Sequence, residues 1–222
     1  MATRRTFDNL SAEKRSRITE VALEEFGQKG FDAASINRMV GRLGIAKGSM
    51  FQYFGDKQGL FRHVFHAATA RVKDYLRAVR DETRDEGLFV RLEGTLLAGI
   101  RFVREHPRIY ALYLRVLFDS RVPFRDELLD SLRSNSQRFL RQLVVSAAER
   151  GELRPGVDPD RVCFLLDAIM DRFLQSLCVP HLDGGLGVYG CDESAARRWA
   201  GDLMEIVRLG VGSETAPTAG SA

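Results

Sequence analysis

The sequence has few cysteines and no long apolar run. Its three cysteines, Cys163, Cys178 and Cys191, are too few and too odd in number for the disulfide framework of a secreted scaffold. No apolar stretch approaches the ~20 residues that a membrane-spanning helix needs. The N-terminus, MATRRTFDNLSAEKR, lacks the apolar core of a secretory signal. These absences favour a protein of the reducing cytoplasm that has no membrane as a partner.

Signatures of common enzyme classes are missing as well. We find no nucleophile elbow, phosphate-binding loop or dinucleotide fingerprint, so we expect no enzyme activity and no cofactor. No strand-like alternation is sustained, and no internal repeat is visible. With 45% hydrophobic and 28% charged residues, the composition is that of a globular protein with a real core. The sequence therefore predicts an all-α fold.

Helical periodicity, capping residues and prolines predict about nine helices. The expected ranges are 12–28, 36–43, a short helix of under ten residues from about 46, 57–84, 88–105, 108–118, from Val122-Pro123 to about 150, 159–179 and 193–210. We expect the first helix to end at Gly30 and the fourth to be capped by Asp56.

The stretch from Ser35 to Lys57, SINRMVGRLGIAKGSMFQYFGDK, has the pattern of a helix-turn-helix. Ser35 is a good N-cap, and Gly44 can adopt the positive φ that ends the first of two short helices. The second helix is expected to bury Met50 and to expose Lys47, Gly48, Ser49 and Gln52. In such motifs the second helix enters the major groove of DNA.

Positive charge is concentrated where this motif lies. Residues 1–60 contain ten basic and seven acidic side chains, an excess that equals the net charge of +3 on the whole chain. A basic surface at this place is what phosphate binding requires.

The string G-I-A-K-G-S-M-F-Q-Y-F-G-D-K resembles the signature of TetR-family transcriptional regulators. The similarity extends upstream through Phe26, Gly27, Gly30 and Ser35 and covers roughly the first sixty residues. It implies a helical head that binds operator DNA and a larger helical body that forms a homodimer and holds a small-molecule pocket. The corresponding boundaries are 1–10 for a flexible basic arm, 11–55 for the DNA-binding domain, 56–211 for the ligand-binding and dimerisation domain, and 212–222 for a disordered tail.

The resemblance also implies which residues touch DNA. Lys47, Gly48 and Ser49 face the groove, where Lys47 can reach a guanine edge or a phosphate. Tyr53 and Lys57 occupy positions that contact the backbone in the family. Two further candidates lie on the first helix of the motif: Ser35, which can hold a phosphate at the helix N-terminus, and Asn37, whose amide suits adenine.

Some of these positions have plainer interpretations. Lys57 can be a solvated residue at a helix start, and Asn37 an ordinary polar surface residue. Arg4 and Arg5 can enter a minor groove or belong to a non-specific tail.

Three residues depart from the family pattern around the turn. Phe51 replaces the usual tyrosine and has no hydroxyl for a phosphate, and we expect Phe51 and Phe54 to belong to the core. Ala46 replaces the usual Ser or Thr cap. Val40 replaces a usual alanine where the two helices approach each other.

The body is rich in aromatic residues, which either form a plain core or line a cavity for a lipophilic effector such as an acyl-CoA, a fatty acid or a hydrophobic drug. By family resemblance, the candidate pocket residues are Phe102, Tyr110, Tyr113, Phe139 and Phe173. The last two helices are expected to form the dimer interface, with Trp199, Leu203 and Ile206 as anchors.

Two rival functions use other residues of the body. A metal- or redox-sensing regulator could use Cys178 and His181 with further Cys and His residues, such as His63 and His66. A helical small-molecule-binding protein or enzyme could use Asp167 and Asp171, although pairing with Arg172 and a dimer contact explain these carboxylates more simply. The leading hypothesis is a dimeric repressor of a palindromic operator that a small molecule releases.

Overall fold

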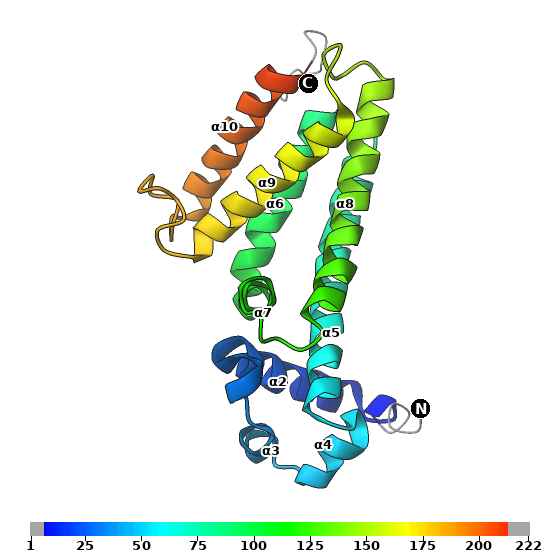
Figure 1. Cartoon of the computed structure of the whole chain (residues 1–222), viewed down its shortest axis with the longest axis vertical. Helices are drawn as coiled ribbons and strands as arrows, with labels where there is room; N and C mark the ends of the chain where they lie inside the picture. Colours follow the sequence, from blue (N-terminus) through cyan, green and yellow to red (C-terminus); the bar gives the residue numbers. More distant parts are fainter. Residues whose placement is uncertain (1–6, 213–222) are drawn as a thin grey trace. The chain divides into compact units, whose positions relative to one another are not determined.

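The computed structural model describes residues 7–212, and in that range the fold is all-α, as predicted (Figure 1). The only extended pairing there is an isolated bridge between Leu153 and Gly212. The helices are α2 (Ala12–Ala33), α3 (Ile36–Leu43), α4 (Lys47–Phe54), α5 (Lys57–Glu82), α6 (Leu88–Glu105), α7 (Pro107–Phe118), α8 (Arg125–Glu149), α9 (Pro159–Cys178) and α10 (Glu193–Val211). Arg4 and Arg5 of the predicted arm, and residues 213–222 of the predicted tail, lie outside the described residues.

The caps of the short helices follow the sequence pattern. The Ser35 hydroxyl accepts the Arg38 backbone N–H at the start of α3. Gly44 ends that helix with φ 67° and ψ 35°, and its N–H donates to the Val40 carbonyl. Ala46 precedes α4 without any side-chain cap, while the Asp56 carboxylate accepts the Gly59 N–H at the start of α5. Local hydrogen bonding therefore sets the turn between α3 and α4.

At Gly30 the backbone leaves the helical conformation, with φ 73° and ψ 178°, as expected of a glycine that ends a helix, and a short second stretch of helix then runs to Ala33 within α2. One helix boundary differs from the predicted one. The long helix α8 starts at Arg125 and not at Val122, because Phe124 adopts a positive φ of 58° that no helix can contain.

The described chain divides into two compact units. One contains residues 7–73 and 106–132, and the other contains residues 74–105 and 133–212. The first unit thus includes more than the predicted 11–55 segment, because it also contains the first part of α5, all of α7 and the start of α8. Helices α5 and α8 each contribute to both units.

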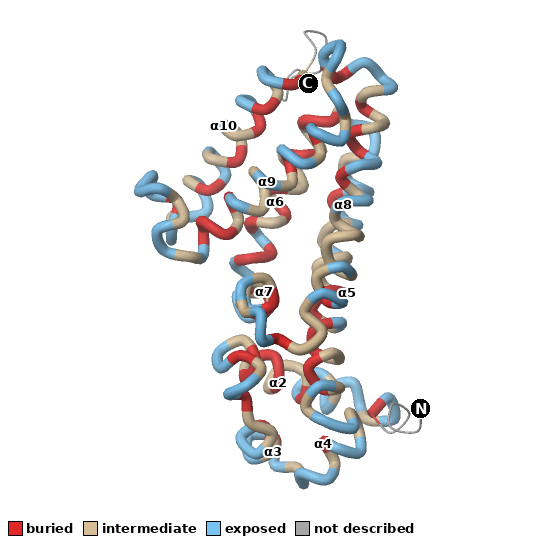
Figure 2. Tube along the Cα trace, in the orientation of Figure 1, coloured by how far each residue is buried: buried red, intermediate tan, exposed pale blue. Residues whose placement is uncertain are grey.

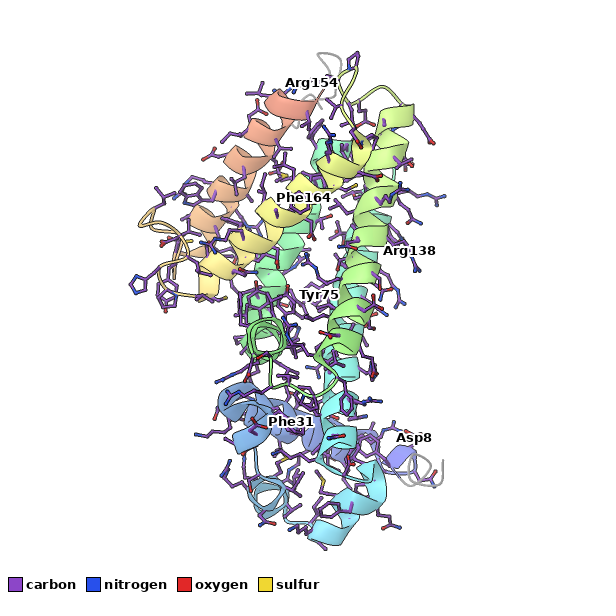
Figure 3. The ribbon with its side chains drawn as sticks, viewed as in Figure 1. Asp8, Phe31, Tyr75, Arg138, Arg154 and Phe164 are labelled. Carbon is purple, nitrogen blue, oxygen red and sulfur yellow. The ribbon has the colours of Figure 1, made fainter. Side chains whose placement is uncertain are left out.

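The first unit has an aromatic and aliphatic core beneath the motif. Phe26 and Phe61 are fully buried and meet edge to face, with ring centroids 4.9 Å apart, and Phe31 lies 5.4 Å from Phe61 (Figure 3). Helix α7 packs along α2, and its Arg115 donates to the Gln28 carbonyl. Helices α2, α5 and α7 therefore pack together in the first unit.

The second unit is built around α6, which contacts both α9 and α10. Its core is one cluster of buried side chains from α6, α8, α9 and α10, with Leu96, Val144, Leu166 and Ala200 fully buried. The Arg154 N–H donates to the Val211 carbonyl and ties the loop before α9 to the end of α10. Across residues 7–212 no helix is long and apolar enough to cross a membrane.

Candidate nucleic-acid interface

Helix α4 has one buried side and one exposed side (Figure 2). Met50 is buried and anchors the helix to the rest of the head. Lys47, Gly48, Phe51 and Gln52 are all exposed, and their spacing of one turn places them on a common face. This is the arrangement expected of a helix that packs on its own domain with one face and presents the other to a partner.

Gly48 has no structural reason to be glycine. It lies inside α4, where glycine costs about 1 kcal/mol relative to alanine. Its φ is not positive, and a Cβ added there would meet nothing within 4 Å. Because the fold would tolerate a side chain, the missing Cβ leaves room for something outside the chain. That interpretation agrees with the predicted close approach of DNA at this position.

The N-terminus of α3 is locked to α2 by a buried carboxylate that the sequence analysis missed. Oε1 of Glu25 accepts the Ser35 backbone N–H at 2.9 Å and the Nε–H of Arg38 at 2.8 Å. The Glu25 side chain is only 7% exposed, whereas that of Arg38 is 51% exposed. Glu25 therefore sets the position of Ser35, one of the residues predicted to hold a phosphate.

The surroundings of Glu25 favour its charged form. Burial alone raises its pKa, but hydrogen bonds from Arg38 and the Ser35 backbone, with the charges of Arg38 and Lys29, outweigh burial and bring the pKa below its ordinary value. The only sequence signal was an acidic residue within the buried face of α2, next to Phe26.

The basic side chains of α3 and α4 differ in their partners. Arg38 pairs with Glu25, and Arg42 pairs with Glu24 at 2.9 Å. Within residues 7–212, Lys47 has no carboxylate partner, and its ammonium lies 5.9 Å from the centre of the Phe51 ring. Lys47 is thus the exposed cation of this surface that stays available for an anionic partner.

Phe51 is not a core residue, so the sequence-based expectation for it was wrong. Its side chain is 41% exposed on the same face as Lys47. Phe54 is half-buried and belongs with Tyr53, Phe7 and His63 to an aromatic cluster at the end of α4. Phe7 is buried there, with its ring centroid 6.0 Å from that of Tyr53 and 4.7 Å from that of His63. Phe7 joins the first described residues of the chain to α4.

The other predicted DNA residues have varied environments. Asn37 is exposed on α3, and Ser49 is half-buried in the first turn of α4. The Lys57 ammonium donates to the Asp32 carbonyl at 2.9 Å and lies 4.8 Å from the centre of the Phe31 ring. Lys57 therefore has an internal partner in addition to its predicted contact with DNA.

The five predicted pocket residues are divided between the two units. Tyr110 and Tyr113 belong to the first, with ring centroids 5.6 Å apart. In the second, Phe102 is buried against Tyr75, while Phe139 and Phe173 pack in or against the core cluster. The first unit also has an open hollow of about 530 Å³ along α7, lined by Gly27, Ala111, Leu114, Arg115, Phe118, Asp119 and Arg121, none of which is a predicted pocket residue.

The carboxylates considered for catalysis have a different partner from the one expected. Asp167 and Asp171 of α9 both pair with Arg133 of α8, and not with Arg172. Burial, followed by the negative charge of Asp171, raises the pKa of Asp167 even though Arg133 opposes the shift. The three side chains form a structural link between α8 and α9 within the second unit.

Two of the predicted dimer anchors are partly covered and one is not. Trp199 and Leu203 pack against the core cluster, whereas Ile206 is 67% exposed. Leu209 of α10 and Phe164 and Leu165 of α9 are exposed apolar side chains of the same unit (Figure 3).

Residues 7–212 contain no group of three or more His, Cys, Asp or Glu that could hold a metal ion. His63, one of the residues considered for such a site, shares a hydrogen bond with Thr19.

The capped helix α3, the left-handed turn at Gly44 and the short helix α4 with its exposed, partly cationic face form a helix-turn-helix, a motif of DNA-binding proteins. Residues 18–64 match the family described as bacterial regulatory proteins, tetR family. A TetR family transcriptional regulator from Chloroflexus aurantiacus is 30% identical in a solved structure, over 95% of this chain and 98% of that one, with a TM-score of 0.70.

Two further known proteins match most of this chain, one in sequence and one in fold. The HTH-type transcriptional repressor AcnR of Corynebacterium efficiens is 25% identical over 190 residues, which are 83% of this chain and 93% of that protein. The ketosteroid transcriptional regulator KstR2 of Mycobacterium tuberculosis is 17% identical, over 93% of this chain and 98% of that one, with a TM-score of 0.63. The chain belongs to the TetR family and is a DNA-binding transcriptional regulator, not an enzyme.

Proposed function

We propose that this regulator is a dimeric repressor that binds a palindromic operator through α4 and is released by a small lipophilic effector. The observation that carries the DNA-contact assignment is the exposed face of α4. There Lys47 has no carboxylate partner among the described residues, and Gly48 leaves space that the fold does not need. Ser35, Asn37, Ser49, Tyr53 and Lys57 complete the proposed contact set.

Selection of bound duplexes from a randomised pool, at fixed salt, tests the DNA assignment and yields the operator sequence. The double variant K47A/Y53A is then expected to lose most of its affinity for the selected duplex. A matched control is Arg138→Ala, which removes one charge from an exposed position on α8 (Figure 3). Undiminished binding by K47A/Y53A would exclude α4 as the recognition helix, and failure to select any sequence would contradict the proposed function.

The dimer is proposed on the apolar surface of the last two helices. Ile206 and Leu209 are 67% and 69% exposed on α10, and large exposed apolar side chains of this kind mark protein interfaces. A two-fold dimer would present two recognition helices to two half-sites, which implies a palindromic operator.

Sedimentation of the double variant I206E/L209E tests this interface, and we expect a monomer that binds one half-site weakly. L186E is the matched control, since Leu186 is equally exposed in the loop before α10. A wild-type monomer at micromolar concentration would contradict the dimer.

Release by an effector is the family's usual mode of control and is proposed here on the aromatic residues of the body, Phe102, Tyr110, Tyr113, Phe139 and Phe173. A ligand acts only through its different affinities for the DNA-bound and free conformations. Native mass spectrometry of the purified protein would identify a co-purified molecule, and adding it to the protein–operator complex should release the DNA. Since operator DNA is the proposed partner, we expect the protein to act in the cytoplasm.

A further inference from the structure

Phe51 has neither of the two roles that its position suggests. It does not fill the core, because it is 41% exposed, and its phenyl ring has no hydroxyl to donate to a phosphate. It nevertheless lies on the exposed face of α4, one turn after Lys47 and three residues after Gly48. An apolar ring on a surface that faces DNA gains free energy when an apolar partner covers it and removes it from water.

The major groove offers one apolar group, the C5-methyl of thymine. Base edges otherwise present hydrogen-bond donors and acceptors, and phosphates are anionic, so neither suits a phenyl ring. Gly48 removes the Cβ that would otherwise stand beside Phe51 on the same face, and apart from its chain neighbours and the nearby backbone of α4 nothing described lies within 4 Å of that space. Helix α4 can therefore lie deep enough in the major groove for the Phe51 ring to contact a base pair.

Lys47 and Gln52 bracket the ring on this face. The Lys47 ammonium lies 5.9 Å from the ring centre, within range of a weak cation–π contact that keeps ring and cation together. Gln52 is exposed next to Phe51, and its amide suits the adenine edge, which faces the groove beside the thymine methyl of the same base pair.

We propose that Phe51 is a specificity-determining residue that contacts the C5-methyl of one thymine in each operator half-site. The proposal rests on the DNA-binding role proposed for α4. This role differs from that of the tyrosine usual at this position in the family, whose hydroxyl can bind a phosphate. The Phe51 ring would instead distinguish thymine from the other bases.

The test uses the full-length protein and the duplex that selection yields. Each thymine of a half-site is replaced in turn by deoxyuridine, which removes only the methyl group. At one position we expect the wild-type affinity to fall by about fourfold per half-site, as for one buried methyl group of about 0.8 kcal/mol. Phe51→Ala should bind the unmodified duplex more weakly and show no further loss with deoxyuridine, whereas Phe51→Leu should keep part of the sensitivity.

Two controls separate this inference from other effects. Gln52→Ala should keep the full sensitivity to deoxyuridine, and Phe118→Ala, which truncates an exposed phenylalanine outside α4, should behave as wild type. The proposal would be overturned if the wild-type affinity is unchanged at every deoxyuridine position, or if deoxyuridine lowers the affinity of Phe51→Ala as much as that of the wild type. Either result would leave DNA binding itself intact. Failure to select any duplex would instead contradict the proposed function.

Discussion

Removal of the Glu25 carboxylate should loosen α3 without unfolding the protein. Glu25 accepts the Ser35 N–H at 2.9 Å and the Arg38 Nε–H at 2.8 Å. Hydrogen bonds to a charged group contribute about 1.5–3 kcal/mol each, and the Arg38 bond belongs at or below the bottom of that range because Arg38 is half exposed. We therefore expect Glu25→Ala to cost about 2–3 kcal/mol, and Glu25→Gln, which keeps an acceptor for Ser35, about 1 kcal/mol.

Hydrogen–deuterium exchange of a peptide covering residues 35–45 measures this effect where it arises. A loss of 2–3 kcal/mol should speed exchange of α3 amides by about 30- to 150-fold in Glu25→Ala. Glu20→Ala is the matched control, since Glu20 lies on the same helix and pairs with Arg71 at a more exposed site. Equal protection of α3 in the two alanine variants would refute the reasoning.

The contribution of Glu25 to the stability of α3 should depend on pH. The pKa of Glu25 is lower in the folded protein than its ordinary value of 4.5, so its contribution to stability is fully present above pH 4.5 and is lost as the pH falls through the folded pKa. The difference in protection between wild type and Glu25→Gln should therefore be largest near neutral pH and shrink below pH 4.5. A difference that grows on acidification would show that charge is not the cause.

Three other substitutions have expected outcomes. Gly48→Ala should stabilise α4 by up to about 1 kcal/mol in thermal melts yet weaken operator binding by about tenfold. A variant that gains stability and binds DNA normally would contradict a close approach of DNA at Gly48. Lys57→Ala should cost about 1 kcal/mol through the lost bond to the end of α2 and the lost contact with Phe31, and should also lower the salt dependence of DNA affinity by about one charge; an unchanged salt slope would leave Lys57 a structural role only. Because burial, then the neighbouring carboxylate of α9, raises the Asp167 pKa above 3.8, its charge opposes folding at pH 7. In urea unfolding at pH 7, Asp167→Asn should therefore leave the free energy of unfolding unchanged or raise it. Any gain should disappear as the pH falls through the raised pKa of Asp167. A clear loss of stability at pH 7 would mean that the attraction between the ionised Asp167 and Arg133 outweighs the cost of burial.

Features set by local hydrogen bonding were predictable from the sequence. The Ser35 cap, the positive φ of Gly44 and the uncapped start at Ala46 are properties of a few neighbouring residues, and all three are confirmed. The boundary at Phe124 was not predictable, because a positive φ at a phenylalanine is locally disfavoured and no pattern of neighbouring residues indicates it.

The candidate site was predictable in outline, and its supports were not. Periodicity was enough to predict an exposed Lys47 and a buried Met50, which the structure confirms. The pairing of Glu25 with Arg38 joins residues on two different helices, and no single-sequence pattern distinguishes a buried glutamate from a surface one. The expectation that Phe51 is a core residue was wrong because hydrophobicity indicates burial only on average, and single apolar side chains are commonly exposed.

The division of α4 into two faces also affects how this regulator can evolve. Met50 is the one buried residue of α4, and the half-buried Tyr53 and Phe54 complete the side of the helix that packs on its own unit. Lys47, Gly48, Phe51 and Gln52 are exposed, so substitutions there are expected to cost little stability. A duplicated gene could therefore acquire a new operator through a few substitutions at these four positions and stay folded at every intermediate step.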